Sequence, residues 1–81
     1  MATAKEYPAI RISTAEAGEL DLLDELEAAE FLRVPFAYLT RLVKRRAIPC
    51  YVMPEGATVF DRYELRLWLR SMHQDVEGQP R

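Results

Sequence analysis

Cysteine, glycine and long hydrophobic runs are scarce in this chain of 81 residues. Cys50 is the only cysteine, so a disulfide within the chain is impossible. No stretch approaches the roughly 20 apolar residues that a membrane span needs. The amino terminus also lacks the apolar segment of a signal peptide. We therefore expect a cytoplasmic protein without a membrane partner.

Motifs of catalysis and metal binding are missing as well. The sequence contains no Gly-rich phosphate loop, no nucleophile elbow and no metalloprotease helix. Cys50 has no neighbour in sequence that would activate a thiol. His73 is the only histidine, and no second metal ligand follows it at a recognisable spacing. We expect neither an enzyme nor a bound cofactor or metal.

The composition is that of one small globular domain with short extensions. It is 49% hydrophobic and 30% charged, which does not fit a disordered chain. We expect an acidic tail or short strand over residues 1–20, a folded domain over 21–73 and a C-terminal tail over 74–81. For the first segment the mobile tail is favoured, although the run from Ala9 to Ser13 is compatible with a strand.

Charge is distributed unevenly along the chain. The net charge is −2, yet residues 1–30 carry −6 and residues 31–50 carry five cations and no acid. Because local charge steers a polyanion more than net charge does, the basic segment is the first candidate for a binding surface. The acidic first third is expected to improve solubility, or alternatively to screen the basic segment.

Capping patterns and helical spacing predict a first and a third helix. Asp24 and Asp61 each precede a glutamate by three residues, as in a capping box. They predict helices over residues 25–32 and 62–72. The apolar side chains expected to face the core from these helices are Leu26, Ala29, Phe31 or Leu32, and Leu65, Trp68, Leu69 and Met72.

A second helix and a hairpin are expected between them. Pro35 disfavours helical geometry before it and is tolerated in a first turn, which predicts a helix over residues 35–46. Its apolar side holds Leu39, Leu42 and Val43, and its other side is polar and basic. β-rich segments on both sides of a Pro-Glu-Gly turn predict a hairpin. The order is that of a small winged helix-turn-helix, a mainly α (α+β) fold.

From about Leu22 to Ser71 the chain resembles the excisionase-like branch of the MerR-type winged helix-turn-helix family. The resemblance rests on Glu27-Ala28-Ala29-Glu30-Phe31-Leu32-Arg33-Val34-Pro35, Leu39-Thr40-Arg41-Leu42-Val43-Lys44, Ile48-Pro49, Phe60, Glu64-Leu65 and Trp68-Leu69. It implies that the second helix enters the major groove of double-stranded DNA and that the hairpin touches the minor groove or backbone. The resemblance implies DNA contacts at Phe36, Ala37, Tyr38, Thr40, Arg41 and Lys44.

Side-chain chemistry refines this set. Arg41 is suited to bidentate bonds with guanine or to clamping a phosphate. Lys44, Arg45 and Arg46 extend the basic side and are suited to phosphate. Thr40 is equally suited to a base edge and to solvent. We expect the aromatic side chains of residues 36 and 38 to pack rather than to read bases.

The chain departs from the family pattern at several places, among them Phe36 and Ala37, where the family often has Arg, Ser or Lys. Arg33 and Arg46 stand where glycine is common, in the turn between the helices and after the second helix. Pro35 replaces the usual Ser or Thr cap and so removes a side-chain acceptor. The hairpin contains no lysine or arginine, although phosphate contacts come largely from cations.

We expect a sequence-specific DNA-binding protein of bacterial or phage origin, either an excisionase-like recombination directionality factor or a small transcription regulator. One such module makes few contacts, so a homodimer or a cooperative array on DNA is expected, with Leu67 and the hairpin as candidate contacts. The alternative is a protein-interaction module on the same fold with weak DNA binding, such as an antitoxin or a terminase small-subunit-like adaptor. Its partner would be an integrase, a toxin or another protein.

Three arginines on the third helix have two possible roles. Arg62, Arg66 and Arg70 recur every four residues and therefore form a ridge along one face of the helix. They either extend the phosphate-binding surface or pair with the acidic first helix near Glu27 and Glu30.

Overall fold

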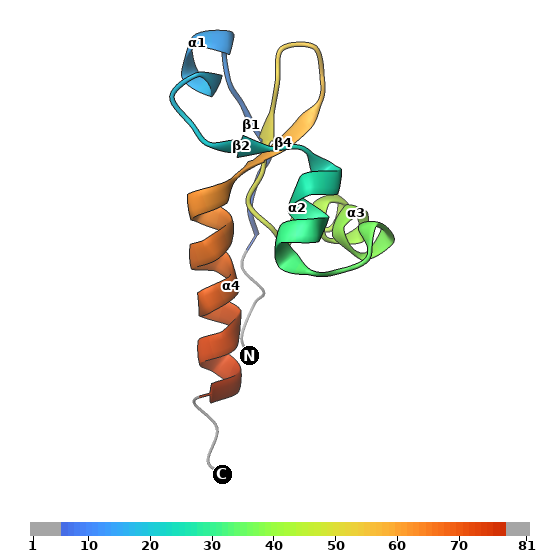
Figure 1. Ribbon diagram of the computed structural model, residues 1–81. Helices are drawn as coiled ribbons and strands as arrows, with labels where there is room; N and C mark the ends of the chain where they lie inside the picture. Colours follow the sequence, from blue (N-terminus) through green and yellow to red (C-terminus); the bar gives the residue numbers. More distant parts are fainter. Residues whose placement is uncertain (1–5, 78–81) are drawn as a thin grey trace.

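The computed structural model describes residues 6–77, with side chains described through residue 72. Figure 1 shows the chain as a small α+β fold. Its elements in chain order are β1 (Ile10–Arg11), α1 (Thr14–Ala17), β2 (Leu22–Leu23), α2 (Glu25–Leu32), α3 (Phe36–Lys44), β3 (Tyr51–Val52), β4 (Thr58–Asp61) and α4 (Arg62–Glu77).

The four strands in the described range form one mixed sheet in the order β1-β3-β4-β2. β3 and β4 are antiparallel and make the predicted hairpin, with Tyr51 opposite Val59. β1 runs parallel to β3, and β2 runs antiparallel to β4. The hairpin therefore has a two-residue strand on each side, one of which joins the N-terminal segment to the fold.

That N-terminal segment joins the fold from Tyr7, whose N–H donates to the Arg46 carbonyl at 2.9 Å and whose side chain packs against the core. Of the two alternatives for it, the strand is the one observed at Ile10–Arg11. The Ile10 N–H donates to the Cys50 carbonyl at 3.4 Å, and the Ile12 N–H donates to the Val52 carbonyl at 3.1 Å. Ile12 is also buried. Residues 10–12 thus belong to the folded domain.

α1 was not among the expected elements. Ser13 accepts a hydrogen bond from the Glu16 N–H at 3.1 Å, and the Glu16 carboxylate accepts one from the Ser13 N–H at 2.8 Å. This is the same capping box that marks α2, where Asp24 and Glu27 exchange both bonds. The Ser-x-x-Glu pattern was the available signal, but none of the four residues of α1 is buried.

The three predicted helices are present, and two of them have other end points than predicted. α2 has the predicted bounds, and α3 lies within the predicted 35–46. α4 begins at the predicted residue but continues to Glu77, into the segment assigned to a tail, while residues 78–81 lie outside the described range. Asp61 caps α4, because its carboxylate accepts the Glu64 N–H at 3.0 Å.

The core lies between α2, α3, the sheet and the first half of α4. Phe60, Leu39, Ile48 and Leu65 are its largest fully buried side chains. Trp68 is buried as predicted, and its ring N–H donates to the Ala47 carbonyl at 3.0 Å.

Two predicted core residues are exposed instead. Leu26 is 63% exposed, because α2 packs through Ala28, Ala29 and Leu32, which lie on another side of the helix. Met72 is 46% exposed, because the end of α4 extends past the sheet and the other helices (Figure 1). Across residues 6–77, no helix combines the length and apolar character that crossing a bilayer requires.

Candidate nucleic-acid interface

α3 has one buried side and one exposed basic side. Leu39 is fully buried in the core cluster, and Leu42 and Val43 pack against that cluster. Because residues three and four apart share a helix face, burial of these three directs Arg41 and Lys44 to solvent, where both are exposed. The amphipathic pattern of the sequence therefore fixes which side of α3 meets the surroundings.

The structure brings the predicted DNA-binding residues together on α3 and just after it. Those that are exposed are Phe36, Ala37, Tyr38, Arg41, Lys44, Arg45 and Arg46. Thr40 is half-buried, and its hydroxyl donates to the Ala37 carbonyl at 2.9 Å. The hydroxyl hydrogen of Thr40 is thus engaged within the helix, and its oxygen remains able to accept a hydrogen bond.

The interpretation of the two aromatic residues as packing residues is wrong. Phe36 and Tyr38 are each 43% exposed. Both lie in the first turn of α3, where the helix begins after Pro35 without a side-chain cap. Apolar side chains are therefore exposed at the start of the helix, whereas its cations Arg41 and Lys44 lie in the last turn.

The cations of this face have no acidic partner within the described part of the chain. Among those residues the single ion pair joins Arg62 to Asp21, with Nε and Oδ2 2.9 Å apart. The positive charges on and around α3 are therefore not neutralised by internal pairing. An unpaired, exposed basic surface attracts polyanions.

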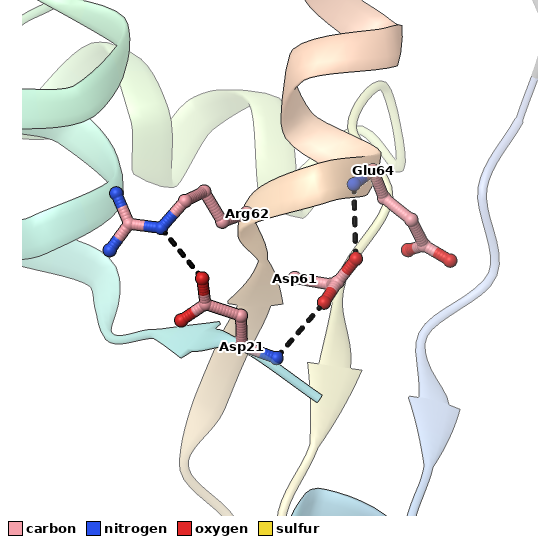
Figure 2. A network of polar contacts seen from close by, with 4 residues as sticks. All are labelled: Asp21, Asp61, Arg62 and Glu64. Carbon is pink, nitrogen blue, oxygen red and sulfur yellow. Dashed lines mark hydrogen bonds and ion pairs between the residues drawn. The ribbon is translucent and has the colours of Figure 1, made fainter. Parts of the chain in front are cut away.

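Arg62 has a structural role instead. Figure 2 shows its side chain on Asp21, whose own N–H donates to the Asp61 carboxylate at 3.3 Å. The Arg62 N–H also donates to the Asp21 carbonyl at 2.9 Å. These bonds attach the start of α4 to the chain entering β2. The two roles expected for Arg62 were phosphate binding and pairing with an acidic residue. The structure shows pairing, but the partner is Asp21 and not Glu27 or Glu30.

The Arg66 side chain lies over the same aromatic ring as that of Arg62. The guanidinium groups of Arg62 and Arg66 lie 5.6 Å and 6.0 Å from the ring centre of Phe31, within the range of cation–π attraction. Both arginines thus stack on α2, on a ring that is itself packed against the core. These contacts with Phe31 account for the positions of both side chains.

The hairpin turn adds no cation to the interface. The Met53 N–H donates to the Ala57 carbonyl and the Gly56 N–H donates to the Met53 carbonyl, both at 2.8 Å. Gly56 has a φ of 105°, which a side chain would disfavour. Figure 1 places α1 and this turn at the same end of the molecule. With Glu16 and Glu55 there, that end is acidic.

The chemistry around Cys50 is unsuited to a nucleophile or a metal ligand. The side chain is buried, and this burial raises the pKa of its thiol. The negative charge of Glu25 raises that pKa further, by a smaller amount. Nowhere in the described chain do three acidic, cysteine or histidine side chains gather in a geometry that could hold a metal ion.

Comparisons with known proteins add no relative. No protein-family model matches this chain. Searches of curated proteins and of solved structures find no match either. The chain is a small α+β domain with a mixed four-stranded sheet, and the resemblance to the excisionase-like family stays a prediction from its residues.

Proposed function

We propose that this protein binds double-stranded DNA through the exposed basic face of α3. One observation carries the proposal. Arg41 and Lys44 lie on the exposed side of a helix whose opposite side is anchored in the core by Leu39. With Arg45 after the helix end, they form a rigid cationic surface without internal ion pairs among the described residues. Such a surface suits the phosphate backbone.

Each residue of the face has a chemical task in this proposal. Arg41 reads guanine through two parallel hydrogen bonds or clamps a phosphate. Lys44 and Arg45 bind phosphates, and the Thr40 oxygen accepts a hydrogen bond from a base amino group. Exposed Phe36 offers apolar contact to a thymine methyl group.

Charge orients the protein on the duplex. The end that holds α1 and the hairpin turn is acidic, so it is repelled by phosphate while α3 is attracted. The hairpin therefore contributes little to affinity, and a single copy makes few phosphate contacts. Useful affinity then requires a homodimer or several copies on adjacent sites.

The biological role that suits such a module is an excisionase-like recombination factor or a small transcription regulator. Both use a short, cationic recognition element on duplex DNA and need no catalytic site. The gene beside it separates the two, because an integrase gene favours excision whereas its absence favours transcriptional control.

Binding to the DNA upstream of its own gene, compared with a scrambled duplex across a salt series, tests the proposal. We expect selective binding that weakens with salt and is lost when Arg41→Ala and Lys44→Ala are combined. Arg11→Gln removes one exposed cation on β1 and serves as the control, with binding unchanged. Equal, weak binding of the wild type and the double variant would exclude α3 as the reader.

A protein-interaction module is the second candidate. Exposed Phe36 and Tyr38 favour it, as does a groove of about 360 Å³ between the N-terminal segment and α4, lined in part by Ile10, Leu67 and Trp68. A toxin, integrase or packaging protein would be the partner. A folded protein that binds neither duplex at low salt would favour this candidate over DNA binding.

A further inference from the structure

Two arginines have left-handed backbone geometry. Arg33 has a φ of 61° and Arg46 a φ of 56°, and no other residue except glycine shows a positive φ in the described chain. The left-handed region is costly for L-residues with a Cβ and is visited mainly by glycine and asparagine. The chain therefore keeps arginine at two positions where the backbone disfavours it.

The same hydrogen-bond pattern creates both positions. After α2 the Val34 N–H donates to the Ala29 carbonyl at 3.0 Å, and after α3 the Ala47 N–H donates to the Leu42 carbonyl at 2.9 Å. A bond spanning five residues backwards closes a helix only when the residue before the donor is left-handed. Glycine would occupy that residue at the lowest conformational cost.

No contact within the described chain accounts for the arginine side chains. Both are exposed, and neither takes part in the single ion pair found there. The negative end of a helix dipole favours cations. This suits Arg33, because α2 has no basic residue in its last turn, whereas α3 already carries Arg41 and Lys44 in its last turn. The hydrogen bonds that close the two helices stabilise the left-handed backbone but do not require an arginine side chain, so both side chains are available to bind a ligand.

Their places relative to α3 suggest what they bind. Arg33 precedes the helix and Arg46 follows it, so the two bracket the basic face at its two ends. The nine residues of α3 rise about 14 Å, close to the roughly 12 Å width of the major groove. A helix of this length in the groove brings its ends near the flanking phosphates.

We propose that Arg33 and Arg46 each bind a backbone phosphate, one at either end of α3, and so fix the depth and register of the helix in the groove. This inference rests on the proposed DNA binding. It adds Arg33 as a contact and gives Arg46 a defined position. Arginine suits this task because its planar guanidinium pairs with phosphate through two hydrogen bonds.

Glycine and lysine substitutions at the two positions test the inference. Fluorescence anisotropy on a labelled, mixed-sequence duplex from about 50 to about 200 mM salt gives the slope of log K against log salt, which counts phosphate contacts. We expect R33G and R46G each to reduce the slope by about 1 and the double variant by about 2. Affinity at low salt should fall several-fold for each, while the midpoint of thermal unfolding stays equal or rises.

Controls separate charge from backbone effects. R33K and R46K keep the cation and should keep most of the slope, whereas R33N and R46N tolerate the left-handed backbone and should lose it. Arg11→Gln, an exposed cation on β1, should change neither slope nor midpoint.

The outcomes distinguish this inference from the proposed function. Wild-type slopes in the glycine variants, together with weakened binding by Arg41→Ala, would overturn the phosphate role and leave DNA binding by α3 intact. A lower thermal midpoint with an unchanged slope would also overturn it and assign the arginines to the helix ends. Wild-type protein that binds no duplex at about 50 mM salt would overturn both proposals.

Discussion

The fold changes the ionisation of Tyr51. Its hydroxyl donates to a Glu64 carboxylate oxygen at 2.6 Å. Burial, this hydrogen bond, and the charges of Glu64 and Asp61 raise the pKa of Tyr51 to about 12. The bond also explains why the predicted capping box at the start of α4 is only half formed, because the Glu64 side chain turns to Tyr51 rather than back to Asp61.

The raised pKa predicts a loss of stability in alkali. A group whose pKa is higher in the folded state stabilises the fold fully below its unfolded pKa, near 10 for tyrosine, and loses that contribution as the pH rises through the folded value. The free energy of unfolding should therefore fall between pH 10 and about 12. Urea unfolding followed by circular dichroism at a series of pH values measures it. Tyr51→Phe should remove this part of the fall, and an identical pH profile in the variant would contradict the assignment.

Residue chemistry also limits what sequence alone reveals about the interface. The exposure of Arg41 and Lys44 follows from helical spacing around Leu39 and was predictable. The left-handed backbone of Arg33 and Arg46 was not, because arginine is a poor signal for that geometry. The deviation from glycine at both positions was visible in the sequence, but its meaning needed the hydrogen bonds that close the helices.

At the scale of the element, the two complete helix caps belong to helices that contribute differently to the core. Asp24 caps α2, which carries three buried residues of the core. Ser13 caps α1, which carries none. Both caps form the complete reciprocal pair of hydrogen bonds. The same local motif therefore has different consequences for the whole fold.

This difference predicts unequal effects of matched cap removals. Asp24→Ala should lower the free energy of unfolding by about 1 kcal/mol, because the first turn of a packed helix loses its acceptor. Ser13→Ala should cost only a few tenths, since α1 can fray without exposing core residues. Chemical denaturation of both variants measures the two values. Equal losses would show that α1 is coupled to the core as tightly as α2.

The elements also show where sequence patterns succeed and fail. α2 and the start of α4 were predictable from their caps, and the hairpin from its turn. β1 and β2 hold two residues each, too few for a period of two to be visible. They exist because the hairpin offers partners that are distant in sequence. Only the tertiary fold specifies such short strands.

At the scale of the whole molecule, the sheet joins the N-terminal segment to the part of the fold that holds α3. Removing residues 1–20 would delete β1 and the buried Ile12 along with the acidic residues. Any change in DNA affinity would then mix lost charge with lost stability. Substitutions that neutralise acidic side chains and leave the backbone in place are the better test of whether the acidic segment screens the positive charge of α3.

Glu16→Gln combined with Glu19→Gln provides that test. Figure 1 places α1 at the end of the molecule that holds the hairpin turn, away from α3. Exposed charges farther apart than about 10 Å are largely screened at 0.1 M salt. We therefore expect the double variant to bind a mixed-sequence duplex within about twofold of the wild type at that salt. A larger rise in affinity that grows as salt is lowered would contradict this expectation. It would show that the negative charges of the acidic segment weaken DNA binding by α3 through space.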